Sequence, residues 1–326
     1  MRHLRLLPIL VAALFVVAVL PAGTMPAPVT IRIGYPTWVG YGPLFLAQAK
    51  GFYQDVKVEL VKMEDIKPRF AALAARRIDG SATTLDAMTL YVKPELPLVA
   101  VLALDDSKGG DGIVARKEIR SIQDLKGKRV AFTEGSVSHF FLSVLLRENG
   151  LTEKDIVVVN MTAGDAGAAF VAGKVDAAVT WEPWLTKGKQ APHGHLLIDS
   201  SKTPGLIVDA LVFRKDVVRE HPEAIMAITR GWHRAVEYWK KNPAESNAIM
   251  AKAVGGWLND PKVFAETLTG IRYYDYESNV KFFGTPANPG PAYRTVQRAI
   301  DIWTELGKIR YKFTAKDVLD SSFLTK

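Results

Sequence analysis

Arg32-Ile33-Gly34-Tyr35 and Arg129-Val130-Ala131-Phe132 are two short apolar stretches, each starting with arginine after polar residues. An aspartate follows each arginine at the same interval: 47 residues separate Arg32 from Asp79, and 47 separate Arg129 from Asp176. Because both aspartates occupy the same place, at the end of a turn between a predicted helix and a predicted strand, we interpret them as structural residues. A recurrence at fixed spacing indicates an internal repeat.

Each copy of the repeat has the pattern of alternating strands and helices. In the first copy we predict strands at 32–35 and 56–61 and helices at 44–51 and 67–76. In the second copy we predict strands at 129–132 and 156–159 and helices at 140–149 and 166–172. A further short apolar strand ends each copy. A βαβαβ unit with short connections forms a parallel sheet with its helices outside, so the repeat predicts two α/β lobes.

The offset between the copies is 97 residues (176 minus 79), and the same offset aligns Gly112 of the first copy with Asp209 of the second. Both residues begin apolar strands that end on a basic pair, at 112–117 and 209–215, and we interpret these strands as crossings between lobes. We therefore expect residues 28–111 to form the first part of lobe 1 and residues 112–211 to form lobe 2. Residues 212–326 should return to lobe 1 and add C-terminal helices.

The C-terminal third has the period of amphipathic helices. Residues 223–241 carry apolar side chains at helical spacing after Pro222, and Pro243 and Pro261 each mark a further helix start. A last helix, 293–306, precedes Gly307, a residue type common just after a helix. We expect this helical extension to clasp lobe 1.

The first 23 residues have the layout of a secretory signal peptide. Arg2 and Arg5 precede an apolar run from Leu6 to Leu20, followed by Pro21-Ala22-Gly23. The run is shorter than the roughly 20 residues that span a bilayer. We expect cleavage near residue 23 and a soluble periplasmic protein, without a lipid anchor because the chain has no cysteine.

Composition limits the function classes. The 326 residues are 48% apolar, which supports a substantial core, and the net charge of +8 comes from lysines and arginines interleaved with acids. The sequence has no run of clustered basic residues of the kind that nucleic-acid-binding proteins usually carry. Motifs for a nucleophile elbow, a phosphate-binding loop or an HExxH metal site are absent from the sequence, and His193 and His195 are a close pair in a loop. We predict no enzyme activity, metal or cofactor.

Several motifs carry a family resemblance: Tyr35-Pro36-Thr37-Trp38, the segments 42–47 and 122–128, and Trp181-Glu182-Pro183-Trp184. Over residues 30–250 the chain resembles the nitrate, sulfonate and taurine (NitT/TauT-type) solute-binding proteins of ABC importers, a class that also includes thiamine-pyrimidine binders. The resemblance implies a two-lobed Venus-flytrap fold of type II that binds a small molecule between its lobes. It also implies a monomer that delivers the ligand to an ABC permease and its ATPase in the inner membrane. A periplasmic sensor module and an enzyme of the thiamine-pyrimidine type remain alternatives.

The candidate site follows from the predicted sheets, because ligands bind beyond the carboxyl ends of parallel strands, where helix N-termini expose N–H groups. Four turns satisfy this rule, after the strands that end near residues 35, 82, 132 and 180, and two acids belong to the strands at the crossings. Ser136 and Thr84 fit equally well as helix caps or as ligand contacts. The candidate ligand-binding residues are Trp38, Tyr41, Thr83, Thr84, Asp106, Asp111, Gly135, Ser136, Ser138, Trp181, Glu182 and Asp209.

These segments contain no arginine but several acids beside aromatic rings. Carboxylates and indoles favour a cationic or donor-rich ligand, through charge-assisted hydrogen bonds and cation–π contacts. Helix N-termini and hydroxyls suit a sulfonate, taurine or nitrate anion instead. We favour a nitrogen-rich solute (pyrimidine, amide or amidine) and keep the anion as the alternative.

Overall fold

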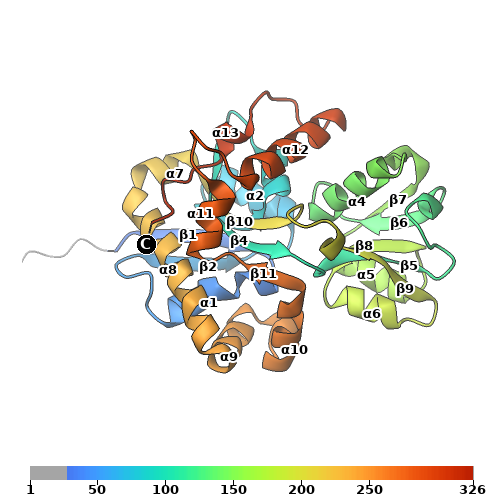
Figure 1. Cartoon of the computed structure of the whole chain (residues 1–326), viewed down its shortest axis with the longest axis horizontal. Helices are drawn as coiled ribbons and strands as arrows, with labels where there is room; N and C mark the ends of the chain where they lie inside the picture. Colours follow the sequence, from blue (N-terminus) through green and yellow to red (C-terminus); the bar gives the residue numbers. More distant parts are fainter. Residues whose placement is uncertain (1–27, 326) are drawn as a thin grey trace, which may run out of the picture.

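Two β-sheets form the centres of two lobes, joined by a pair of chain crossings (Figure 1). The computed structural model describes residues 28–325. The predicted signal peptide, residues 1–23, lies outside the described residues. The α/β fold with two lobes and a C-terminal helical region confirms the predicted fold class.

Lobe 1 contains the larger sheet, with strand order β11-β4-β10-β3-β1-β2. β1 pairs in parallel with β2 and β3, whereas β10 is antiparallel to β3 and β4. The parallel half therefore corresponds to the predicted βαβαβ unit. The strands are β1 (Thr30–Tyr35), β2 (Lys57–Lys62), β3 (Gly80–Thr84), β4 (Leu98–Ser107), β10 (Val208–Arg214) and β11 (Ile271–Tyr273).

Lobe 2 contains a five-stranded sheet with order β7-β6-β8-β5-β9. β6 is parallel to β7 and β8, and β5 is antiparallel to β8 and β9, so the arrangement repeats that of lobe 1. The strands are β5 (Asp111–Arg116), β6 (Arg129–Phe132), β7 (Val157–Asn160), β8 (Ala177–Trp181) and β9 (Gly194–Asp199).

The helices that connect these strands cover both faces of each sheet, as short parallel connections require. Those of lobe 1 are α1 (Gly42–Ala49), α2 (Ile66–Ala74) and α3 (Leu85–Tyr91), and those of lobe 2 are α4 (Val137–Glu148), α5 (Ala163–Val171) and α6 (Trp184–Gln190). Each helix predicted from the repeat is present, with its ends shifted by a few residues.

The two copies of the repeat exchange their last strands. β5 begins at residue 111 and β10 at residue 208, again 97 residues apart (208 minus 111), yet β5 completes the sheet of lobe 2 and β10 that of lobe 1. The connections between lobes are residues 108–110 and 200–207. The strands expected to be the crossings, 112–117 and 209–215, correspond instead to β5 and β10, and the predicted boundary between residues 211 and 212 falls within β10.

The repeated aspartates play the same structural role in both lobes. The backbone N–H of Arg32 donates to Asp79 at 2.8 Å, and that of Arg129 donates to Asp176 at 2.9 Å. The arginine that ends each exchanged strand, Arg214 or Arg116, also pairs with the aspartate of its lobe. The structural interpretation of both aspartates is confirmed.

The C-terminal helices pack on lobe 1, as Figure 1 shows. Trp232 of α8 and Trp303 of α12 are fully buried there. Among the described residues no helix has the length and apolar character needed to cross a membrane. These helices are α7 (Lys215–Glu220), α8 (Pro222–Lys241), α9 (Pro243–Val254), α10 (Pro261–Thr267), α11 (Tyr276–Phe283), α12 (Pro291–Glu305) and α13 (Ala315–Val318).

Candidate functional site

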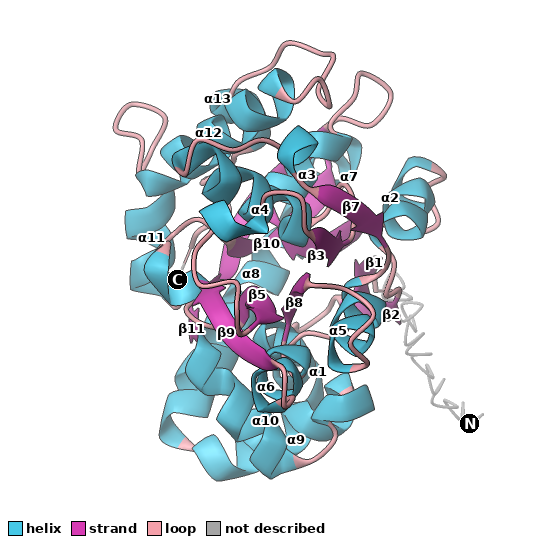
Figure 2. Ribbon diagram, turned by 90° about the vertical axis from the view of Figure 1, so that its right-hand side faces the viewer, coloured by secondary structure: helices cyan, strands magenta, loops and turns pink. Residues whose placement is uncertain are grey.

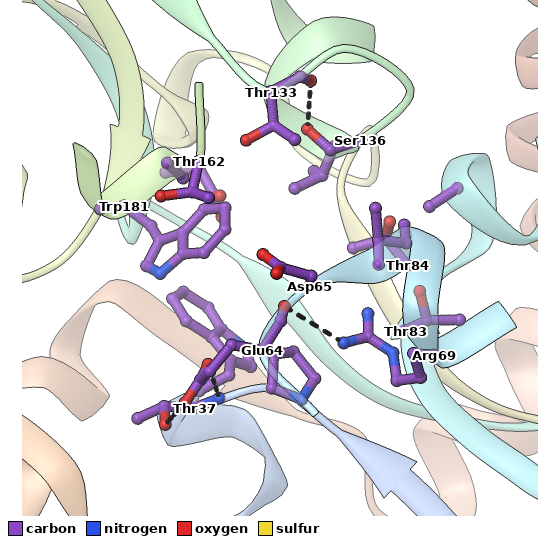
Figure 3. A pocket seen from close by; sticks show the side chains of 18 of the residues that line it. Thr37, Glu64, Asp65, Arg69, Thr83, Thr84, Thr133, Ser136, Thr162 and Trp181 are labelled. Carbon is purple, nitrogen blue, oxygen red and sulfur yellow. Dashed lines mark hydrogen bonds between the residues drawn. The ribbon is translucent and has the colours of Figure 1, made fainter. Parts of the chain in front are cut away.

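A cleft of about 430 Å³ lies between the lobes, where strand ends and helix N-termini of the two lobes face each other (Figure 3). Figure 2 is turned so that lobe 2 faces the viewer. Lobe 1 supplies the residues after β1, β2 and β3, and lobe 2 supplies those after β6, β7 and β8. The lining residues are Pro36, Thr37, Trp38, Tyr41, Lys62, Glu64, Asp65, Ile66, Arg69, Thr83, Thr84, Ala87, Asp111, Thr133, Ser136, Val137, Thr162, Ala163, Gly164, Trp181, Trp184, Asp209, Gly256 and Trp257.

Most of the residues selected from the sequence line this cleft. They come from six strand ends or turns that are far apart in the chain, and the fold brings them together in one cavity. The residues are Trp38, Tyr41, Thr83, Thr84, Asp111, Ser136, Trp181 and Asp209.

Four of the selected residues do not line the cleft. Asp106 lines a different cavity beside the second crossing, where it accepts from the Gly205 N–H at 3.2 Å and pairs with Arg272 at 3.4 Å. Glu182 accepts from the backbone and hydroxyl of Thr186 at 3.1 and 2.9 Å. Gly135 and Ser138 flank Ser136 on either side. We do not retain Asp106 and Glu182 as contacts within the cleft.

An arginine lines the cleft, contrary to the expectation from the sequence. Arg69, on the first turn of α2, is 3% exposed, and its Nη1 donates to the Met63 carbonyl oxygen at 2.6 Å. The dashed line in Figure 3 marks its longer bond, of 3.5 Å, to the Glu64 carbonyl oxygen. Its Nε is buried without a hydrogen-bond partner in the described structure. Burial lowers the pKa of the Arg69 guanidinium, and the nearby Tyr41, Glu64 and Asp209 oppose this shift. The cleft thus contains a buried cation with donors left over.

Three buried carboxylates lie at or beside the cleft: Asp209 and Asp105 belong to lobe 1, and Asp111 begins β5 of lobe 2. Tyr41 donates to Asp209, and the Trp38 indole N–H donates to both oxygens of Asp105 at 3.2 and 3.3 Å. Burial raises the pKa of Asp111 to about 6, although the Ser107 hydroxyl donates to it at 2.7 Å. Burial also raises the pKa values of Asp105 and Asp209, and each is raised further by a neighbouring carboxylate. Burial in the protein therefore favours the protonated form of each of these acids, relative to the same group in water.

Hydroxyl groups from both lobes line the cavity, and two of them, those of Thr84 and Ser136, precede helices without capping them. Thr84 and Ser136 occupy the residues before α3 and α4, yet neither accepts a hydrogen bond from its helix. Ser136 instead donates to the Thr133 carbonyl oxygen at 2.7 Å, as the dashed line in Figure 3 shows. Thr162 does cap α5, since it accepts from the Asp165 N–H at 3.2 Å. The N–H groups at the start of the 12-residue α4 are therefore available.

Tryptophans give the cavity its apolar surface. Trp181 and Trp184 reach it from lobe 2, and Trp38 and Trp257 from lobe 1. Trp38 is 6% exposed, so most of its indole is buried in lobe 1. In Figure 3, Trp181 lies across the cavity from Arg69, Thr83 and Thr84. The cleft thus has an aromatic side and a polar side.

The sequence pattern of the NMT1/THI5-like family matches residues 38–246, more than half of the chain. The chain belongs to the NMT1/THI5-like family. This assignment confirms the resemblance noted from the motifs, because the matched segment contains the cleft turns after β1, β2, β3, β6, β7 and β8.

Relatives of this NMT1/THI5-like chain include solute-binding proteins. A Bacillus subtilis protein named for aliphatic sulfonate binding is 25% identical over 307 residues, covering 91% of this chain and 87% of its own. The taurine-binding periplasmic protein of Escherichia coli is 23% identical over 296 residues, covering 86% and 88%. The alkanesulfonate-binding protein of Xanthomonas axonopodis, solved with bound MOPS, superimposes with a TM-score of 0.70 at 20% identity, covering 91% and 100%. The last of these comparisons shows a shared fold.

Two turns of this NMT1/THI5-like cleft were missed from the sequence. The turn after β2 contributes Glu64 and Asp65 and leads into Arg69, and the turn after β7 contributes Thr162 and Gly164. The rule about strand ends and helix N-termini applies equally to β2 and β7. Applying it to all six parallel strands would have found both turns.

Metal ligation has no support among the described residues, since 28–325 contain no group of three or more His, Asp or Glu side chains placed to hold an ion. His193 and His195 bond to the carbonyl oxygens of Phe170 and Ile119 at 2.9 and 2.7 Å.

Proposed function

We propose that this chain is the periplasmic solute-binding protein of an ABC importer and has no catalytic role. The observation that carries the proposal is the cleft itself, whose walls come from two lobes that the chain connects at residues 108–110 and 200–207. Such lobes can close on a ligand by hinge motion. The relatives named for sulfonate and taurine binding support this role.

The partners follow from this role. A membrane permease, with its ATPase, would receive the loaded protein, and the protein would act as a monomer after removal of residues 1–23. We place the hinge between the lobes in the connections 108–110 and 200–207 rather than inside β5 and β10. Residues in connections between strands can absorb the backbone rotation that lobe closure requires.

For the ligand we propose a small organic solute with an anionic group at one end and hydrogen-bond donors at the other. Arg69 has a buried Nε without a partner, and the N-terminus of α4 offers N–H groups, so both suit an anionic group such as a sulfonate. Asp111 and Asp209, on the same cavity, suit an amine or amide donor. An aminosulfonate such as taurine combines both features.

A nitrogen-rich ligand without an anionic group is the second candidate. The exposed Asp65 points into the cavity in Figure 3, and its carboxylate makes no capping bond to α2. Together with Asp111, Asp209 and four indoles, Asp65 suits a cationic or amidine group.

A thermal-shift screen of the mature protein tests the function. Taurine, ethanesulfonate, nitrate, 4-aminopyrimidine, guanidine and urea are the probes, because each represents one of the ligand classes. A ligand that binds only the folded state stabilises it by mass action, so the matching class should raise the melting temperature by several degrees. No shift with any class, together with turnover of one of them, would contradict a binding role.

A further inference from the structure

His139 is a fully buried histidine on the first turn of α4, next to the turn that carries Ser136. Its Nδ1 accepts a hydrogen bond from the backbone N–H of Gly135 at 3.0 Å. Gly135 has φ of +73°, in the left-handed region that favours glycine. A single side chain thus bonds to the backbone of the turn that lines the lobe-2 wall of the cleft.

The hydrogen bonds of His139 define its tautomer. Because Nδ1 accepts from Gly135, the proton must reside on Nε2, which lies 2.5 Å from Glu153 Oε1 and donates to it. Ser143 also donates to that glutamate oxygen at 3.1 Å. The position of His139 matches that of the Glu or Gln in a capping box, where the third helical residue reaches back to a backbone N–H before the helix.

The same imidazole contacts the other lobe. Its ring meets the indole of Trp303, on α12, edge to face with centroids 5.0 Å apart. Trp303 is fully buried, and its Nε1 donates to the Asp86 carbonyl oxygen at 3.0 Å, in the first turn of α3 after Thr84. A Cβ built on Gly135 would lie 3.2 Å from Leu90 of α3, so the turn itself approaches lobe 1.

We propose that His139 is a positioning residue for ligand capture. Its Nδ1 fixes the Gly135–Ser136 turn by a hydrogen bond, and its ring packs against Trp303 of lobe 1. The link to ligand capture rests on the proposed function, whereas the effect on the turn does not. His139 therefore contacts both the turn in the lobe-2 wall of the cleft and the Trp303 indole. That indole in turn donates to the carbonyl oxygen of Asp86 in lobe 1.

Two substitutions separate the hydrogen bond from the packing. His139→Phe keeps a ring against Trp303 but removes the acceptor, and His139→Gln keeps an acceptor that can reach the same N–H. His233→Phe is the matched control, because His233 is a buried histidine of α8 whose ring nitrogens have no hydrogen-bond partner in the described structure. Hydrogen–deuterium exchange of peptides covering 133–142 in the unliganded protein measures the order of the turn.

We expect His139→Phe to exchange about tenfold faster in this peptide, since an unpaired N–H in a loosened turn opens more often. His139→Gln should return the rate close to wild type, and His233→Phe should leave this peptide unchanged. Equal exchange in wild type and His139→Phe would overturn the proposal, as would a Gln variant that behaves like Phe.

If His139→Phe does not fold, the ¹⁵N spectrum of histidine-labelled wild type decides. A His139 ring protonated on Nε2 alone supports the proposal, and one protonated on Nδ1 overturns it. Calorimetry with taurine and ethanesulfonate then separates the two levels of inference. A wild type that binds neither probe counts against the proposed aminosulfonate-type ligand without altering the exchange result. A disordered turn that leaves affinity for a bound probe unchanged overturns the positioning role while sparing the proposed function.

Discussion

The carboxylate of Asp86 is buried in the first turn of α3, where the residue is only 2% exposed. Burial raises the pKa of Asp86 to about 7, well above its ordinary value of 3.8. The folded state therefore binds the proton more tightly than the unfolded chain. Stability attributable to this group should be full below the unfolded pKa and should fall as pH rises toward the folded pKa.

Replacing Asp86 with Asn should remove the loss of unfolding free energy that Asp86 causes as the pH rises. Between pH 4 and pH 8 the variant should lose less unfolding free energy than wild type does, by up to about 4 kcal/mol, since one pKa unit is about 1.4 kcal/mol. Urea unfolding at both pH values measures the difference, and the cost of burying the new amide cancels in the comparison. Parallel pH profiles for the two proteins would contradict the assignment.

Arg69 and Asp111 together decide the ligand class. For a ligand with an anionic end and a donor end, Arg69→Gln and Asp111→Asn should each weaken binding about tenfold or more, because each removes a charge-assisted hydrogen bond. For a purely anionic ligand, only Arg69→Gln should weaken binding. For a nitrogen-rich cation, only Asp111→Asn should weaken binding. Calorimetry with the best probe of the screen distinguishes the three outcomes, and circular dichroism checks that both variants fold.

At the scale of elements, the repeated aspartates give a matched pair of substitutions. The side chains of Asp79 and Arg214 are 16% and 9% exposed, whereas those of Asp176 and Arg116 are 29% and 30% exposed. Removing one partner of a buried ion pair costs more than removing one from a solvated pair. Asp79→Ala should lower the unfolding free energy by about 3 kcal/mol, and Asp176→Ala by about 1 kcal/mol. Equal losses in urea titrations would argue against this difference in burial.

The repeat made the parallel elements of both lobes predictable. Arg32, Asp79, Arg129 and Asp176 recur at one interval because each lobe closes its βαβαβ unit with the same hydrogen bond. The exchange of β5 and β10 left no local signal, because an apolar strand looks the same in either sheet. Hence the crossings were placed inside strands.

The candidate site was predictable where it follows from strand ends. Thr84 and Trp181 end strands, Trp38 and Ser136 lie in the turns that follow strands, and all four line the cleft. Arg69 lies within a helix, and its burial depends on how α2 packs against the other elements, which no local pattern reports. The premise that the cleft lacks an arginine was therefore wrong.

For the whole molecule, hinge closure is the expected response to ligand. The connections 108–110 and 200–207 should bend while His139 and Trp303 remain in contact, because both side chains are fully buried and closely packed. Small-angle scattering should show a smaller radius of gyration with saturating ligand. An unchanged radius despite calorimetric binding would mean that the described arrangement is already closed.

The exchanged strands also impose an order of assembly. Lobe 2 is one uninterrupted stretch, 111–199, whereas the sheet of lobe 1 needs β4 and β10, whose starts are 110 residues apart (208 minus 98). Contacts between distant segments form slowly, because the chain between them must first be brought together. During refolding from urea, pulse-labelled amides of β6 and β8 should therefore become protected before those of β3 and β10, so that lobe 2 serves as the early nucleus onto which lobe 1 closes.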